Sequence, residues 1–151
     1  MKHLLILASL LLCFTNLIYS AERDLPLDSG RKYICYELGN FYAIYIADGD
    51  SICDVIVHDS RGSCDSTTCQ KSPILKWAFD DMGNETTKSP AIPNNAYGPL
   101  YYTLSILSDG SSKTISSSML ITDYSDDVER KIKELKTFII QLWIPFIEGK
   151  Q

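Results

Sequence analysis

Basic residues are scarce in this chain, which has 14 Lys and Arg against 19 Asp and Glu and a formal net charge of −5. Proteins that bind nucleic acids take much of their affinity from clustered cations that contact phosphates. The densest basic stretch consists of Arg130, Lys131, Lys133 and Lys136. These residues lie within a predicted helix that starts with acidic residues, which indicates a solvated helix face and not a phosphate-binding site. The sequence therefore predicts no nucleic-acid partner.

Recognisable catalytic motifs are also missing. The chain has two histidines, His3 and His58, and the sequence contains neither a G-x-S-x-G elbow nor a glycine-rich phosphate loop. No 12-residue calcium loop with a closing glutamate follows the acidic residues near position 50. We therefore expect no catalytic residue, no cofactor and no metal. The alternative is a hydrolase that brings His58 and a carboxylate such as Asp54 into one cleft.

No apolar run reaches the roughly 20 residues that a membrane-spanning helix needs. The apolar stretch Leu4–Leu12 follows the basic start Met1-Lys2-His3. The whole N-terminal segment ends near Ile18-Tyr19-Ser20. This pattern is typical of a secretory signal peptide. The sequence predicts a signal peptide over 1–20 and a single extracellular domain over 21–151, without an integral membrane span.

Cysteine usage fits an exported protein. Cys13 falls within the predicted signal peptide, which leaves Cys35, Cys53, Cys64 and Cys69. An even number of cysteines in a secreted chain predicts two disulfides. The spacing of Cys64 and Cys69, without a nearby histidine, is poor for a zinc site.

Residues 31–59 have the clearest local pattern. Three runs rich in β-branched and aromatic residues are separated by the dipeptides Gly39-Asn40 and Asp48-Gly49. Such dipeptides supply the positive φ angles that two-residue hairpin loops require. The pattern predicts a three-stranded antiparallel meander.

That meander limits the disulfide pairing. Two-residue loops would set Cys35 and Cys53 on either side of Ile44 in the central strand. Neighbouring strands lie about 4.8 Å apart, so two strand spacings separate Cys35 from Cys53 by roughly 9.6 Å. This distance exceeds the Cα separation of about 7 Å that a disulfide tolerates. We therefore expect Cys64 and Cys69 to pair with Cys35 and Cys53, in either combination. Residues 61–70 would then form a stapled loop.

The middle of the chain is less regular. Pro73–Phe79 begins with a proline, which suits the first turn of a short helix. Residues 80–99 are rich in Gly, Pro and Asn, and predict a long exposed loop. This loop contains Asn84-Glu85-Thr86, an acceptor triplet for N-glycosylation in an exported protein.

A second hairpin is expected over 100–122, around a four-residue turn at Asp109–Ser112. Its predicted register gives one apolar face and one face rich in Ser and Thr. The opposed apolar pairs would be Ile106 with Ile115, Tyr102 with Met119, and Leu100 with Ile121.

The C-terminal region predicts a helix from Asp126 to Trp143, with Asp126-x-x-Glu129 as its N-terminal cap and Pro145 stopping or kinking it. Apolar residues recur at helical spacing: Val128, Ile132, Leu135, Ile139 and Leu142. The predicted fold class is α+β, with an antiparallel sheet packed against this helix. The alternative role for the apolar residues 138–147 is binding to a membrane surface or a partner.

Tyr33-Ile34-Cys35 follows soon after the predicted signal peptide. Together with the small size, this motif resembles the aromatic-x-Cys motif of secreted effector candidates from plant-pathogenic fungi, especially powdery mildews. The resemblance implies a ribonuclease-like fold of a sheet packed on a helix, which usually lacks catalytic residues and acts by binding host proteins or by being detected by host immune receptors. The sequence departs from that family after Cys35, where hairpins replace a helix, and its last cysteine is Cys69 rather than one near the C-terminus.

These features together predict a secreted, non-enzymatic binding protein, such as a virulence effector or immune-modulating factor, whose partner is a host or extracellular protein. Recognition is expected on the 61–70 loop and the neighbouring 80–99 loop. The candidate binding residues are Arg61, Asp65, Gln70, Trp77 and Tyr97. Two alternatives are a lipid- or membrane-binding protein and a ribonuclease-like hydrolase that uses His58.

Overall fold

The computed structural model of the protein describes residues 27–28, 30–39, 42–59, 62–87, 91–93 and 101–148. The predicted signal peptide lies outside these residues. In chain order the elements are β1 (Tyr33–Leu38), β2 (Tyr42–Ala47), β3 (Ile52–Asp59), β4 (Cys64–Gln70), α2 (Pro73–Asp80), α3 (Met82–Glu85), β5 (Ala91–Pro93), β6 (Tyr102–Ser108), β7 (Ser111–Ser117), β8 (Leu120–Thr122) and α4 (Asp126–Glu148).

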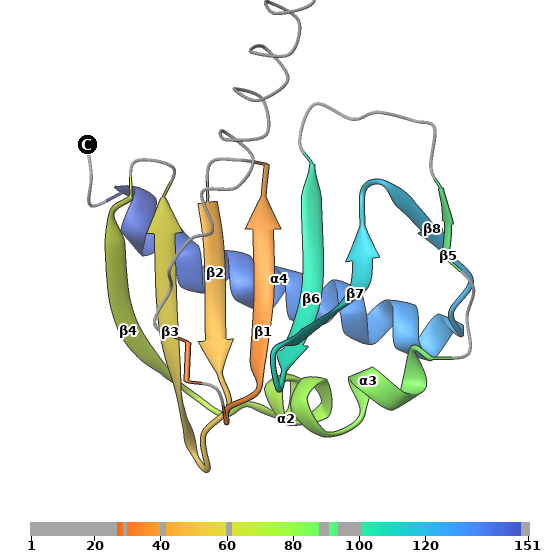
Figure 1. The fold of residues 1–151 in the computed structure, drawn as a ribbon, viewed down its shortest axis with the longest axis horizontal. Coiled ribbons are helices and arrows are strands. Elements are labelled where there is room, and N and C mark those ends of the chain that lie inside the picture. Colours follow the sequence, from red (N-terminus) through yellow and green to blue (C-terminus); the bar gives the residue numbers. More distant parts are fainter. Residues whose placement is uncertain are drawn as a thin grey trace, which may run out of the picture.

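An antiparallel sheet and a long C-terminal helix form the two main layers, which confirms the predicted α+β class. The six-stranded sheet has the order β4-β3-β2-β1-β6-β7, and β5 pairs with β8 in a separate two-stranded sheet (Figure 1). All the pairings are antiparallel. The four strands from β1 to β4 therefore lie side by side in chain order, and β1 joins them to β6.

The predicted registers in the first half of the sheet are wrong. Cys35 lies opposite Tyr45 rather than Ile44, and Val57 rather than Cys53 lies opposite Ile44. Side chains alternate between the two faces of a strand, so these shifts decide which residues meet. Cys53 lies on the same face as Ile34, whereas Cys35 lies on the opposite face.

The second hairpin has a tighter turn than predicted. Ser108 pairs with Ser111, which leaves Asp109 and Gly110 as a two-residue turn with positive φ at both positions. The register then shifts between Leu104 and Ser105. β7 ends at Ser117, and the chain turns into β8, where Ile121 is opposite Ile92. The predicted pairing of Tyr102 with Met119 is therefore not formed.

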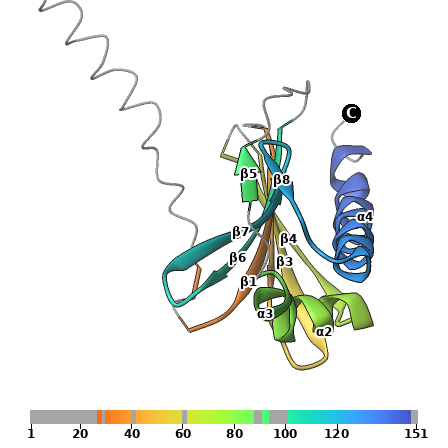
Figure 2. The ribbon, with the colours of Figure 1, turned by 90° about the vertical axis from the view of Figure 1, so that its right-hand side faces the viewer.

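The main hydrophobic core lies between the sheet and the helices. Figure 2 shows α4 and α2 on the same side of the six-stranded sheet. Burial of apolar area between the two layers is the main favourable contribution to folding. The fully buried core residues from the sheet, α2, α3 and α4 include Ile34, Ile46, Val55, Leu75, Met82, Leu104, Ile132, Leu135 and Ile139.

A smaller cluster covers the other face of β1 and β2. It contains Tyr33, Cys35, Ala43, Tyr45 and Ala47, which are at most 6% exposed. Leu27, Ile56 and Leu107 pack against this cluster. Strands that are buried on both faces are apolar almost continuously rather than alternately. This burial accounts for the uninterrupted runs of tyrosine and aliphatic residues in β1 and β2.

The helix α4 starts with a different cap from the predicted one. The Val128 backbone N–H donates to Ser125 Oγ at 3.4 Å, and the Glu129 N–H donates to the Ser125 carbonyl at 2.9 Å. Glu129 does not reach back to Asp126, because its carboxylate accepts a bond from Thr122 Oγ1 at 2.9 Å. Ser125 is therefore the N-cap, and the acidic residues occupy the first turn.

Two further predictions need correction. Of the two effects predicted for Pro145, the stop is not seen, because α4 continues to Glu148. Phe146, which follows the proline, packs against the core, and this burial offsets the backbone hydrogen bond that the proline removes. The predicted loop over 80–99 contains the helix α3 and the strand β5. Complete burial of Met82 anchors α3, a tertiary contact that local composition does not reveal.

Candidate functional site

The structure does not assemble the predicted binding residues into one surface. Arg61 and Tyr97 lie outside the described residues. Trp77 is 8% exposed and belongs to the core, which contradicts its predicted surface role. Asp65 and Gln70 lie towards opposite ends of β4. Residues 64–70 are an outer strand rather than a stapled loop, so the candidate surface has to be built from that strand.

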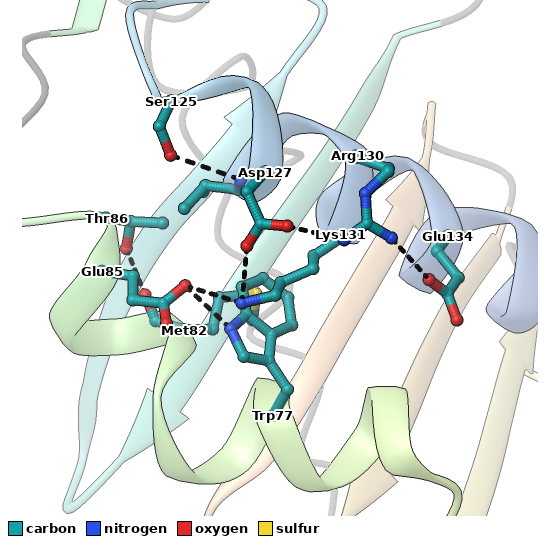
Figure 3. Close-up of polar contacts among 10 residues, drawn as sticks. Trp77, Met82, Glu85, Thr86, Ser125, Asp127, Arg130, Lys131 and Glu134 are labelled. Carbon is teal, nitrogen blue, oxygen red and sulfur yellow. Dashed lines mark hydrogen bonds and ion pairs between the residues drawn. The ribbon is translucent and has the colours of Figure 1, made fainter.

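Trp77 belongs to a polar network that links α2 and α3 to α4 (Figure 3). Its Nε1 donates to Glu85 Oε2 at 2.9 Å. Lys131 Nζ lies 5.2 Å from the centre of the Trp77 ring, 3.4 Å from Glu85 Oε2 and 2.9 Å from Asp127 Oδ2. The cation thus bridges two helices while it covers the indole face. This arrangement explains why the tryptophan is unavailable to a partner.

The charges of this network neutralise one another. Hydrogen bonds from Lys131 and Arg130 lower the pKa of Asp127, and the bond to Asp127 raises the pKa of Lys131. Both groups therefore stay charged near neutral pH, which suits ion pairing and not proton transfer. An open groove of about 660 Å³ runs beside them. Five of its six lining residues have polar side chains, and two of these are carboxylates: Asn84, Glu85, Thr87, Ser125, Asp127 and Val128.

His58 is not paired with Asp54, the carboxylate named as an example for the hydrolase alternative. His58 and Asp54 lie four residues apart along β3, and such a spacing corresponds to about 13 Å. Asp54 instead accepts a 2.8 Å ion pair from Arg31. Cys64 lies opposite His58 in β4, and His58 Nδ1 is buried with no hydrogen-bond partner in the described part of the chain. The proposed His58–Asp54 constellation is therefore not formed.

The four described cysteines are not joined by disulfides, so the predicted two-disulfide arrangement is not present. Cys35 is buried on the face of the sheet opposite to Cys53. Cys64 is exposed on β4, and Cys69 lies opposite Cys53. The physical reason is the register: only one pair of these cysteines lies on adjacent strands and on the same face.

Two backbone hydrogen bonds fix the direction in which the amides of β4 point. The Lys71 N–H donates to the Ser51 carbonyl at 2.9 Å, and the Asp59 N–H donates to the Ser63 carbonyl at 3.0 Å. Backbone groups of successive residues in an antiparallel strand face opposite sides. The odd-numbered residues of β4 therefore bond to β3, and the outward backbone groups belong to Cys64, Ser66, Thr68 and Gln70.

This outer edge lacks the usual protection against strand addition. Within the described residues β4 pairs only with β3, and its sequence contains neither lysine nor proline. Natural sheets usually block their edges with such residues, with bulges, or with a covering segment. The opposite edge strand β7 has a register irregularity and leads into β8. β4 is therefore the edge that is better suited to accept another strand.

The remaining expected features lie at separate places. Asn84 is exposed on α3, while the hydroxyl of Thr86 donates to the Met82 carbonyl at 2.6 Å. On α4, Ile140 and Ile144 are 38% and 42% exposed, and two such residues make a smaller apolar surface than the broad apolar face of an interfacial helix.

Among the described residues, no helix meets the length and apolarity needed to cross a bilayer. These residues also contain no group of three or more side chains suited to hold a metal ion.

No family model matches the sequence, and no curated protein or solved structure was found to be similar to it.

Proposed function

We propose that the protein is a secreted, non-enzymatic binding protein that holds an extended segment of a partner protein against the outer edge of β4. The single observation that carries this proposal is the row of outward backbone groups on a seven-residue edge strand. Strand addition uses such groups for affinity and uses alternate side chains for specificity. The partner is a host or extracellular protein, as expected for a virulence effector or immune-modulating factor.

The side chains beside this edge support a polar recognition site. Ser66, Thr67 and Thr68 are exposed, and threonine suits both the extended backbone and hydrogen bonding to a partner. Ile52, which is 51% exposed, lies opposite Gln70 and adds an apolar contact at one end of the strand. Secretion would also place the thiols of β3 and β4 in an oxidising compartment.

A library of linear peptides displayed on phage tests this function, with the secreted chain 21–151 as the target. The informative variant is Thr68→Pro, which removes an outward N–H without breaking the bonds between β3 and β4. The control is Thr68→Ala, which keeps the backbone N–H and removes only the side-chain hydroxyl and methyl.

We expect enriched peptides to bind the wild type and Thr68→Ala, and to lose at least tenfold in affinity for Thr68→Pro. Binding should also slow amide exchange at Ser66 and Thr68. Equal binding to Thr68→Pro, or a failure to enrich any peptide, would contradict an edge-binding function. Circular dichroism of each variant establishes that a loss of binding is not a loss of fold.

A further inference from the structure

Cys53 and Cys69 form a cross-strand pair. They lie directly opposite each other in the register of β3 and β4. Cys53 is fully buried, and Cys69 packs against the same hydrophobic core. Both side chains therefore lie on the face of the sheet that is covered by the helices.

The backbone geometry suits a bond between these residues. The flanking hydrogen bonds at Ser63 and Lys71 assign the odd-numbered residues of β4 to hydrogen-bonded pairs. Such pairs have Cα atoms about 5.5 Å apart. A disulfide usually joins Cα atoms that are about 4.4 to 6.8 Å apart. The Cα separation typical of this pair type thus falls within the range that a disulfide spans.

The other pairings do not fit this fold. Cys64 and Cys69 are five residues apart on one strand, which corresponds to about 17 Å. Because Cys69 lies opposite Cys53, Cys64 is displaced from Cys53 by the same five positions in the register. Cys35 lies two strands from Cys53 and on the opposite face, and it is three strands from β4, or about 14 Å. Each of these separations exceeds the reach of a disulfide.

We propose that Cys53 and Cys69 are joined by a disulfide when the chain folds in an oxidising compartment, and that this bond fastens the edge strand β4 to the sheet. The oxidant is a disulfide of the glutathione class. One cysteine thiolate attacks a sulfur of the oxidant and releases one glutathione thiol. The second thiolate then displaces the other glutathione. Two thiols are thus oxidised to one disulfide, and one oxidised glutathione is reduced to two thiols.

The pKa values of the two thiols affect how fast this bond forms. Burial raises the pKa of Cys53, and burial with a contribution from Cys53 raises the pKa of Cys69 to about 11. The thiolate is the reactive form, and it is rare in these thiols at neutral pH. Because Cys53 is also fully buried, we expect the bond to form faster before β4 has packed fully than in the folded, reduced chain.

Peptide mapping tests the pairing directly. The chain is refolded in a mixture of reduced and oxidised glutathione, alkylated, and digested without reduction. We expect one dominant linked peptide that joins Cys53 to Cys69, and alkylated Cys64. A dominant link between any other two cysteines, or the alkylation of both Cys53 and Cys69, would overturn the proposal. This result does not depend on a binding partner, so it is independent of the test of the edge-binding function.

Hydrogen exchange tests the role of the bond in holding β4. The protein oxidised at Cys53 and Cys69 is compared with the same protein after phosphine reduction and with Cys69→Ala. Cys64→Ala is the matched control, because it removes a cysteine from the same strand and leaves the bond intact.

We expect β4 to exchange at least tenfold faster in the reduced protein and in Cys69→Ala, and at an unchanged rate in Cys64→Ala. Equal exchange in the oxidised and reduced wild type would overturn the fastening role. The reduced wild type serves as the readout even where Cys69→Ala fails to fold. Oxidation rates of the reduced protein with and without urea test the timing, and urea should accelerate oxidation.

Discussion

At the residue scale, Cys69 couples the stability of the reduced protein to alkaline pH. Its pKa in the folded state is about 11, compared with an ordinary value of 9.0. The folded state therefore favours the neutral thiol more strongly than the unfolded state does. The resulting contribution to stability is fully present below about pH 9 and is lost as pH rises towards about 11.

We predict that the urea midpoint of the reduced wild type falls more steeply over this pH range than the midpoint of Cys69→Ala. The comparison removes the effect of lysines and tyrosines, which titrate at similar pH in both proteins. Equilibrium unfolding followed by tryptophan fluorescence measures the midpoints. Parallel pH profiles for the two proteins would contradict the raised pKa.

Leu135 is the most informative core position on α4, because its side chain is fully buried between the helix and the sheet. We predict that Leu135→Ala lowers the free energy of unfolding by about 2 to 5 kcal/mol through lost burial and a residual cavity. The neighbouring Glu134→Ala should change it by no more than about 0.5 kcal/mol, because that side chain is exposed. Urea titration of both variants measures the difference, and equal losses would place Leu135 outside the core.

At the scale of single elements, the alternation of backbone groups in β4 has a measurable consequence. Amides of Asp65, Thr67 and Cys69 bond to β3, whereas those of Ser66 and Thr68 point outwards. We predict slower exchange for the first set than for the second, measured by NMR. Uniform protection along the strand would indicate that another segment covers the edge.

The element scale also separates what local patterns reveal from what they miss. The periodic apolar residues of α4 predicted its buried face, because only one stripe of a helix can face a sheet. The turn dipeptides of the first half predicted strand boundaries approximately but gave wrong registers. A register depends on which side chains meet across the strands, and β1 and β2 are buried on both faces, so alternation gave little guidance.

At the scale of the whole molecule, export and glycosylation can be tested together. We predict that cells with a secretory pathway release the chain with Ala21 as its first residue and with a glycan on Asn84. The exposed position of Asn84 leaves room for the glycan on the folded surface. Protein sequencing and a mobility shift after glycosidase treatment measure these outcomes, with Asn84→Gln as the control. Retention of residues 1–20 would contradict the predicted signal peptide.

The sequence by itself determined the α+β class and the covering role of the C-terminal helix, because composition and helical periodicity are local properties of the chain. Only the tertiary structure decided that Trp77 is core, that residues 64–70 are an edge strand, and that Cys69 lies opposite Cys53. These facts depend on contacts between segments distant in sequence. Such contacts follow from packing and strand register, which no short stretch of sequence specifies alone.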